Sequence, residues 1–218
     1  MCGGIGWYSL DLPVGHPQFG RALPCECQAR RRAEILQAVC GLNEDERLAR
    51  LGDVVAAGPG TAAMLDAARA FIAKPAGILT VWGKCGNAKT TVLQAIVNEC
   101  LDRNLSAVYV TLYDLINWVR DAFRDDTDSA WGRVHRLTAV SVLCIDEFDK
   151  IKITEWSEEL QTAVLDRRYR DGLSGRVGTV LAMNSDPNHL PEWIYSRLCD
   201  GRNRIVHNAD PDLRPRMR

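Results

Sequence analysis

Short apolar runs that alternate with helical stretches restrict the fold of this 218-residue chain more than any other feature. The apolar runs fall at residues 78–82, 108–111, 140–145, 179–183 and 204–206. Segments with helical character follow three of them, at residues 89–104, 111–123 and 155–170. Short buried strands separated by helices are typical of a parallel sheet with helices on both sides. The sequence therefore predicts an α/β fold.

The residues ahead of the first strand divide into two parts. The first part is rich in Gly, Pro and Cys and shows neither a helical nor a strand period. The second part contains helical segments, and Asn43 with Glu46 has the spacing of a capping box. Thr61 is the expected cap of the next helix. The predicted divisions are a Cys-rich module at 1–28, a helical linker at 29–60 and a main α/β domain at 61–218.

A glycine-containing loop, Gly83–Thr90, follows the first strand and opens a helix. Backbone N–H groups at such a helix start hold phosphate oxygens, helped by the helix dipole. Lys89 is expected to reach the β- and γ-phosphates, and the Thr90 hydroxyl to ligate Mg²⁺. The expected nucleotide-binding residues of this segment are Gly83, Lys84, Cys85, Gly86, Asn87, Ala88, Lys89, Thr90 and Thr91. A turn that merely links strand to helix is the alternative.

Ala88 departs from the phosphate-loop pattern G-x-x-x-x-G-K-[ST], which has a glycine at this position. If the backbone here needs a positive φ, alanine costs roughly 1 kcal/mol or more. If the residue is already helical, alanine fits well. We expect Ala88 to affect the rate of nucleotide hydrolysis more than nucleotide binding.

Two carboxylates, Asp146 and Glu147, end the third apolar run about 55 residues after the loop. Asp146 is expected to hold Mg²⁺, directly or through water, and Glu147 to orient and deprotonate an attacking water. The adjacent Glu favours hydrolysis over phosphate transfer to a small molecule. A solvated loop acid is the alternative for Glu147.

Three polar residues further along are candidate phosphate sensors. Asn184 ends the fourth apolar run, where its amide is expected to hydrogen-bond the γ-phosphate or the water. Arg197 is a candidate finger that reaches a neighbouring subunit's ATP, and a surface salt bridge is its alternative. Arg214 is a candidate second sensor.

These elements, in this order, resemble the AAA+ ATPases. The residues within and between the motifs resemble the DnaC/IstB group of helicase loaders and transposition helpers. The resembling stretches include residues 41–43, 46–47, 109–115, 146–150, 165–169, 184–187 and 196–201. The resemblance implies a five-stranded parallel sheet, ATP with Mg²⁺, head-to-tail self-association and contact with single-stranded DNA. It also implies a DnaB-like replicative helicase as partner for a loader, or a transposase for a transposition helper.

Cys2, Cys25 and Cys27 resemble the halves of a zinc knuckle. Structural zinc takes four ligands, so one is missing, and His16 is the nearby substitute. A degenerate knuckle and an unstructured tail are the alternatives. In the loaders that the chain resembles, such a module contacts the helicase.

The net charge of −1 provides no global field that attracts nucleic acid, so any DNA contact needs a local basic patch. Candidates near Trp118 and Trp131 are Arg120, Arg124, Arg133 and Arg136, and a second cluster is Arg30–Arg32. Neighbouring aspartates at 121, 125, 126 and 128 cancel much of the first patch, so a solvated helical face is the alternative.

The leading functional interpretation is an ATPase that loads a replicative helicase. The alternatives are a transposition helper and an ATP-gated adaptor with little turnover. A small-molecule kinase is disfavoured by Glu147, Asn184 and Arg197 together. No apolar run is long enough to span a membrane and no secretory signal opens the chain, so we expect a cytoplasmic protein with reduced cysteines.

Overall fold

The computed structural model describes residues 7–24, 41–124, 129–151 and 154–213. The chain forms two compact units, Met1–Ala38 and Val39–Arg218. In the first unit, strand β1 (Trp7–Ser9) pairs antiparallel with β2 (Ala22–Pro24). Each strand has only three residues, which is too short for a period-2 pattern to be visible in the sequence.

The second unit is built on a five-stranded parallel sheet with the strand order β4-β5-β6-β3-β7. Its strands are β3 (Gly77–Trp82), β4 (Ala107–Thr111), β5 (Val142–Asp146), β6 (Gly178–Met183) and β7 (Arg204–His207). All residues of β5 and β6 are buried, as expected for central strands covered on both faces. The prediction of a five-stranded parallel sheet flanked by helices is confirmed.

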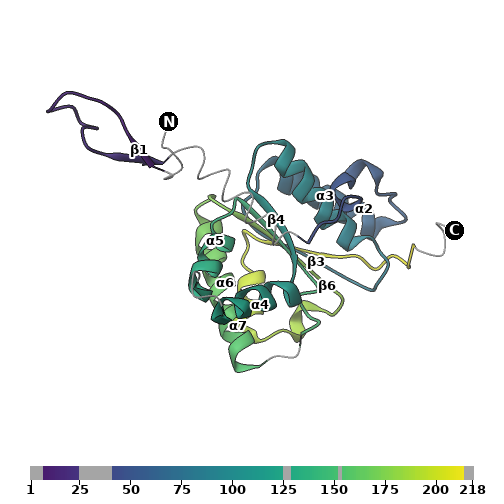
Figure 1. Cartoon of the computed structure of the whole chain (residues 1–218). Helices are drawn as coiled ribbons and strands as arrows, with labels where there is room; N and C mark the ends of the chain where they lie inside the picture. Colours follow the sequence, from purple (N-terminus) through teal and green to yellow (C-terminus); the bar gives the residue numbers. More distant parts are fainter. Residues whose placement is uncertain (1–6, 25–40, 125–128, 152–153, 214–218) are drawn as a thin grey trace. The chain divides into compact units, whose positions relative to one another are not determined.

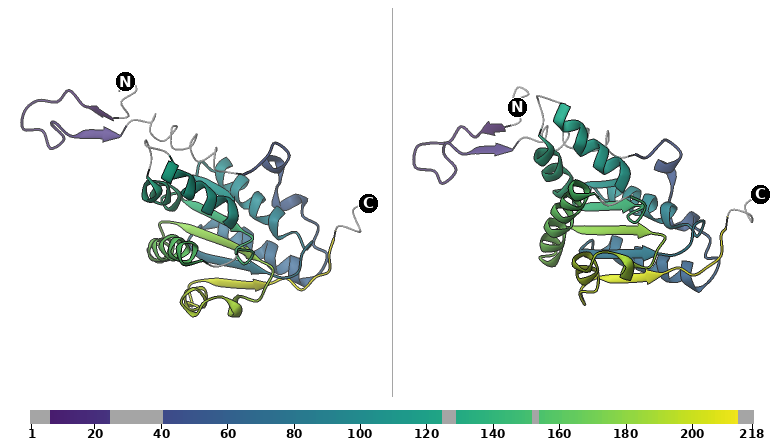
Figure 2. Two further views of the ribbon diagram at one scale, coloured as in Figure 1. Left: turned by 60° about the horizontal axis from the view of Figure 1, so that its bottom comes forward. Right: turned by 90° about the horizontal axis from the view of Figure 1, so that it is seen from below.

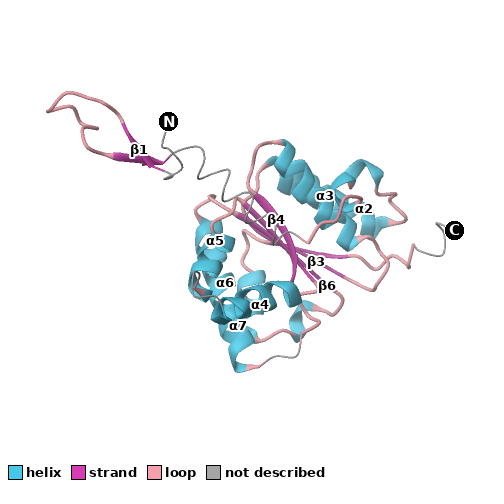
Figure 3. Ribbon diagram, in the orientation of Figure 1, coloured by secondary structure: helices cyan, strands magenta, loops and turns pink. Residues whose placement is uncertain are grey.

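Helices cover both faces of this sheet (Figure 1). Their bounds are α2 (Pro59–Ala73), α3 (Lys89–Asp102), α4 (Leu112–Asp121), α5 (Ala130–Thr138), α6 (Glu155–Leu173) and α7 (Glu192–Leu198), with 3₁₀ turns η3 (Ala122–Arg124) and η4 (Pro187–His189). Helices α2 and α3 lie on one face, and α4, α5, α6 and α7 lie on the other (Figure 2). Coloured by secondary structure, the strands form the middle layer between the two groups of helices (Figure 3). Of these, α5 was not predicted.

One hydrophobic cluster lies between the sheet and helices α2 and α3. Met64 of α2, Ile96 of α3 and Val180 of β6 are all fully buried in it. The strands are parallel, so their carboxyl ends share one edge of the sheet, which is where ligands bind in open α/β folds. The polar residues that follow β3, β5 and β6 are therefore presented along that edge.

A buried arginine, Arg168 of α6, lies at the opposite edge of the sheet, where β5 and β6 begin. Its guanidinium donates to the carbonyl oxygens of Thr138 (3.1 Å), Val140 and Gly178, and Nε donates to the Thr179 hydroxyl (2.9 Å). The side chain is fully buried, so these acceptors replace its water shell. Arg168 therefore ties α6 to the starts of β5 and β6.

The start of α2 differs from the prediction that Thr61 caps this helix. The helix begins at Pro59, and its N-cap, Gly58, has no side chain to accept a hydrogen bond. The Asp210 carboxylate accepts from the backbone N–H groups of Gly60 (3.2 Å) and Thr61 (2.6 Å) instead. The hydrogen bond from Thr61 holds the pKa of Asp210 below its ordinary value. The cap comes from about 150 residues away, so a local pattern could not reveal it.

The Asn43–Glu46 capping box is confirmed by reciprocal hydrogen bonds of 2.8 and 2.9 Å. It opens only short 3₁₀ turns, η1 (Glu46–Leu48) and η2 (Leu51–Asp53), in place of a regular helix. These turns dock on α3, where the Asn98 amide donates to the Glu46 carbonyl at 2.8 Å. Across the described residues, we find no helix with the length and apolarity needed to cross a membrane.

Candidate functional site

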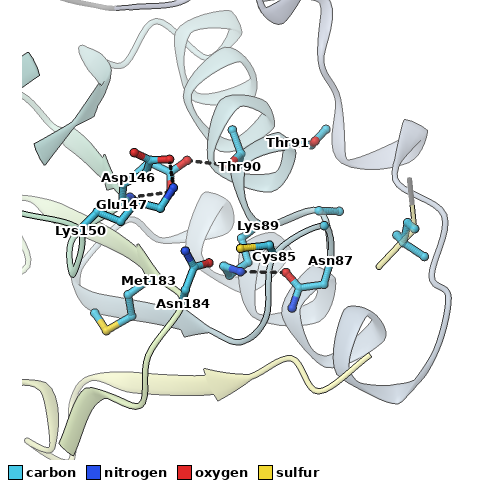
Figure 4. A pocket seen from close by; sticks show the side chains of 13 residues that line it. Cys85, Asn87, Lys89, Thr90, Thr91, Asp146, Glu147, Lys150, Met183 and Asn184 are labelled. Atoms are coloured by element: carbon cyan, nitrogen blue, oxygen red, sulfur yellow. Dashed lines mark hydrogen bonds and ion pairs between the residues drawn. The ribbon is translucent and has the colours of Figure 1, made fainter. Parts of the chain in front are cut away.

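Residues from separate loops line a pocket at the carboxyl edge of the sheet (Figure 4). They follow β3, β5 and β6, and the strand order β5-β6-β3 brings them together. The predicted site residues found in this lining are Cys85, Gly86, Asn87, Ala88, Lys89, Thr90, Thr91, Asp146, Glu147 and Asn184. The pocket also contains Lys150, Met183 and Leu213, which the sequence did not single out.

Lys89 lies inside the loop that precedes α3. Its ammonium donates to the carbonyl oxygens of Gly83 (2.6 Å) and Lys84 (2.8 Å) and to Asn87 Oδ1 (3.0 Å). Burial lowers the pKa of Lys89, while the charge of Asp146 acts in the opposite direction. The three acceptors hold a buried cation at a helix start, the position where an anion is also favoured. A phosphate group fits this place because it can take over the lysine's hydrogen bonds.

Ala88 has φ 66° and ψ 13°, which is the left-handed region. The position therefore does need a positive φ, and the first of the two alternatives for Ala88 holds. The methyl group costs about 1–2 kcal/mol there relative to right-handed backbone. The chain has retained a strained alanine at the residue before Lys89.

We expect the substitution Ala88→Gly to raise the free energy of unfolding by about 0.5–1 kcal/mol. Removing the methyl relieves the left-handed strain, and the greater freedom of glycine in the unfolded chain offsets part of the gain. Urea unfolding followed by circular dichroism measures the change. Ala139→Gly is the matched control, since Ala139 is exposed with φ −86°, and there glycine should destabilise. A loss of stability in both variants would contradict the strain at Ala88.

Asp146 and Thr90 form the part of the pocket suited to a divalent cation. Thr90 Oγ1 donates to Asp146 Oδ2 at 2.7 Å, and the hydroxyl of Tyr109 donates to the same oxygen at 3.0 Å. A carboxylate and a hydroxyl that already touch are hard oxygen ligands of the type Mg²⁺ takes alongside water and substrate phosphates. The residues present therefore fit the ion. Tyr109 is a partner that the sequence did not reveal, since it lies within an apolar strand.

Glu147 follows Asp146 in a left-handed backbone conformation, with φ 54°. Its carboxylate accepts a hydrogen bond from the Lys150 ammonium, and that bond raises the pKa of Lys150. The Glu147 side chain is 41% exposed, so water reaches it. Asn184 extends from the end of β6, and its amide points into the pocket toward Lys89 and Cys85 (Figure 4).

The segment after β7 returns to the phosphate loop. The Asn87 amide donates to the Asn208 carbonyl (2.9 Å), and the fully buried Asn208 amide donates to the Asn87 carbonyl (3.0 Å). The Leu213 N–H donates to the Gly86 carbonyl at 2.9 Å. A β-carbon on Gly83 would lie 2.0 Å from the Asn208 carbonyl oxygen, so this close approach requires glycine. The segment that follows β7 thus holds the loop through these hydrogen bonds.

Arg197 does not line the pocket. Nη2 lies 2.6 Å from Asp166 Oδ1, and the guanidinium also lies over the rings of Tyr169 and Trp193. Arg214 and the candidate zinc ligands Cys2, Cys25 and Cys27 lie outside the described residues. Among the residues that are described, no cluster of three or more His, Cys, Asp or Glu side chains could hold a metal ion. Zinc at the three cysteines stays a prediction.

Two of the candidate DNA-contacting arginines lie against tryptophan rings of their own domain. Arg120 lies over Trp156 at 5.2 Å, and Arg133 lies over Trp118 at 5.5 Å. Trp131 remains exposed beside them. Arg30–Arg32 lie outside the described residues. DNA contact by this surface stays a prediction.

The chain matches one family model and several curated proteins. The model of the family "ATPase family associated with various cellular activities (AAA)" matches residues 79–202. The replicative helicase loader DnaC of Escherichia coli K12 is 27% identical over 118 residues, which is 54% of this chain and 46% of DnaC. The replicative helicase loader DnaI of Bacillus subtilis 168 is 26% identical over 121 residues, 55% of this chain and 37% of DnaI. The matches thus span less than half the length of these relatives.

Solved structures show the same fold. A crystal structure of DnaI aligns with a TM-score of 0.61 at 21% identity, covering 79% of this chain and 94% of that one. The replication initiator DnaA bound to AMPPCP and single-stranded DNA aligns with a TM-score of 0.66 at 17% identity, covering 78% and 52%.

Proposed function

Since this chain belongs to the AAA family of ATPases, we propose that it binds ATP with Mg²⁺ in the pocket of Figure 4 and hydrolyses the bond between the β- and γ-phosphates. The observation that carries this proposal is the meeting of four groups in one pocket: the Lys89 ammonium, the Thr90–Asp146 pair, the Glu147 carboxylate and the Asn184 amide. Each is a group that phosphoryl transfer to water requires.

The loop and Lys89 bind the phosphates. N–H groups in the first turn of α3 have no acceptor within the helix and donate readily to an anion. Lys89 exchanges its bonds to Gly83, Lys84 and Asn87 for phosphate oxygens. When bound, Mg²⁺ neutralises charge that develops on the β- and γ-oxygens, and Thr90 and Asp146 would hold it.

Glu147 and Asn184 act on the attacking water. The Glu147 carboxylate takes the water proton once it has left Lys150, with which it is paired in this structure. Asn184 orients the water or the γ-phosphate through its amide. Both side chains border the pocket from neighbouring strands, β5 and β6, so one water can meet both.

Arg197 is proposed to act in a neighbouring subunit. It lies outside the lining of its own pocket, so its action would be on an adjacent copy in a head-to-tail assembly, after it has left its ion pair with Asp166. There its charge would stabilise the negative charge of the transition state.

Loading of a replicative helicase onto single-stranded DNA is the biological role we propose. It is supported by the similarity to two helicase loaders and by the fold shared with DnaA. The partners of this chain are then a DnaB-like helicase, single-stranded DNA and further copies of itself. The cysteine module at residues 1–28 is the proposed contact with the helicase.

Steady-state ATP hydrolysis with and without single-stranded DNA, joined to a pull-down against a hexameric replicative helicase, tests this role. We expect DNA to stimulate turnover and the helicase to be retained in the presence of ATP. No complex with the helicase, together with a complex with a transposase, would favour the transposition-helper alternative.

Lys89→Ala should weaken ATP binding by about 10- to 100-fold, because a charged hydrogen bond to phosphate is worth about 1.5–3 kcal/mol. A fluorescent ATP analogue titrated against both proteins measures the change. Lys74→Ala is the matched control, since Lys74 is exposed at the end of α2 and lies outside the pocket lining. Equal binding by wild type and Lys89→Ala would place the nucleotide elsewhere.

A second candidate function is an ATP-gated adaptor that binds ATP and turns over slowly. The strained Ala88 and the engagement of Glu147 by Lys150 favour it. Tight ATP binding with negligible turnover, even with DNA and helicase present, would select this candidate.

A further inference from the structure

Asp149 joins the loop after β5 to the end of β6. Its Oδ2 atom accepts hydrogen bonds from the backbone N–H of Asn184 (3.0 Å), the backbone N–H of Ser185 (2.7 Å) and the hydroxyl of Ser185 (2.5 Å). Nearby, the backbone N–H of Phe148 donates to the Ala182 carbonyl at 2.9 Å. The loop that presents Glu147 is therefore bonded directly to the turn that presents Asn184.

The second carboxylate oxygen of Asp149 is buried and has no hydrogen-bond partner among the described residues. Asp149 does not itself line the pocket. Asp149 is half-buried, and a carboxylate with three donors on one oxygen and a second oxygen buried without a described partner carries a desolvation cost that a purely structural turn could avoid.

We propose that Asp149 is a positioning residue: it fixes the backbone at Asn184 relative to Glu147, so that the amide and the acid meet the same water at the γ-phosphate. This rests on the proposed ATPase function. Asp149 reaches no substrate and acts only through Asn184. Because a misplacement of about 1 Å at a reacting group costs on the order of 100-fold in rate, three hydrogen bonds that hold this turn are consequential.

The central test is Asp149→Ala. The variant loses all three acceptor contacts, so we expect kcat to fall about 10- to 100-fold. The KM for ATP should rise by less than kcat falls, since residues 83–90 and their contacts with Lys89 are untouched. Asp66→Ala is the matched control, because Asp66 is exposed and pairs only with Arg69 among its described contacts. Its kinetics should equal those of wild type.

Rescue by the conservative variant separates positioning from charge and from folding. Asp149→Asn keeps an oxygen where Oδ2 accepts, and its amide nitrogen occupies the place of the unpartnered oxygen. We expect Asp149→Asn to recover most of kcat. If Asp149→Asn and Asp149→Ala lose kcat equally, or if kcat falls only in proportion to a lowered melting temperature, the positioning role is overturned.

A double-mutant cycle with Asn184→Ala tests the route. If Asp149 acts through Asn184, the double variant should be no slower than Asn184→Ala alone, within about twofold. Multiplicative losses would show that Asp149 acts by another route, which overturns the proposal.

A binding measurement keeps this test separate from that of the ATPase function. Asn184 contacts the γ-phosphate in the proposed site, so we expect Asp149→Ala to lose most of the preference for a non-hydrolysable ATP analogue over ADP. If wild type binds ATP without turnover, hydrolysis fails as the proposed function, and this preference still decides the role of Asp149. An unchanged preference in Asp149→Ala, with unchanged kcat where turnover exists, would overturn it.

Discussion

Glu147→Gln should reduce ATP turnover by about 100- to 10,000-fold, the range that a positioned general base contributes. The amide keeps the size of the side chain but cannot accept the proton of the attacking water. ATP binding should remain close to that of wild type, because Lys89, Thr90 and Asp146 make their contacts without Glu147. The variant should therefore accumulate in the ATP-bound state and favour any ATP-dependent assembly.

Phosphate release under steady-state conditions and a nucleotide titration measure these two properties. Glu159→Gln is the matched control, since this glutamate of α6 is exposed and does not belong to the pocket lining. Turnover by Glu147→Gln at the wild-type rate would remove Glu147 from the mechanism.

Arg168→Met should lower the free energy of unfolding by about 3–5 kcal/mol, because several buried neutral acceptors lose a charged donor at once. Methionine fills much of the space but leaves the carbonyl oxygens of Thr138, Val140 and Gly178 without their donor. Each buried acceptor that loses its partner costs about 1–3 kcal/mol.

Urea unfolding measures this loss as a shift in the midpoint. Arg170→Met, two residues further along α6, is the matched control, because Arg170 is exposed and, among the described residues, hydrogen-bonds the Asp166 carbonyl of its own helix. We expect the control to change stability by no more than about 0.5 kcal/mol. Equal stabilities for the two variants would mean that water can replace the guanidinium at the sheet edge.

The central sheet could be predicted because each strand is encoded by a contiguous run. Residues 140–145 are almost all apolar, and the structure buries the strand Val142–Asp146 completely. Helix α5 was missed because it has only nine residues, among them Gly132, Arg133 and Arg136. The linker turns η1 and η2 were predicted as helix because a capping box signals a helix start without specifying how far the helix continues.

The candidate site was predictable to the extent that its groups follow strands. Asp146, Glu147 and Asn184 lie at or directly after an apolar run, and Lys89 ends the loop that follows another. Parallel strands bring such positions to one edge. Lys150, Tyr109 and Asp149 were missed. Tyr109 lies within a strand, and the other two look like ordinary charges of a loop. Their importance depends on partners that no local pattern names.

The sequence by itself determined the layered α/β architecture and the order of the phosphate loop and the acids. Periodicity and strand ends are local properties, and they operate over spans of about ten residues. Only the tertiary structure decided the left-handed conformation of Ala88, the cap that Asp210 provides for α2, and the joining of Asp149 to Asn184. The two contacts link residues 149 and 35 positions apart. The residues of such a pair meet only when the strands pack into the sheet. Before that, each residue has many possible partners, and packing selects one of them.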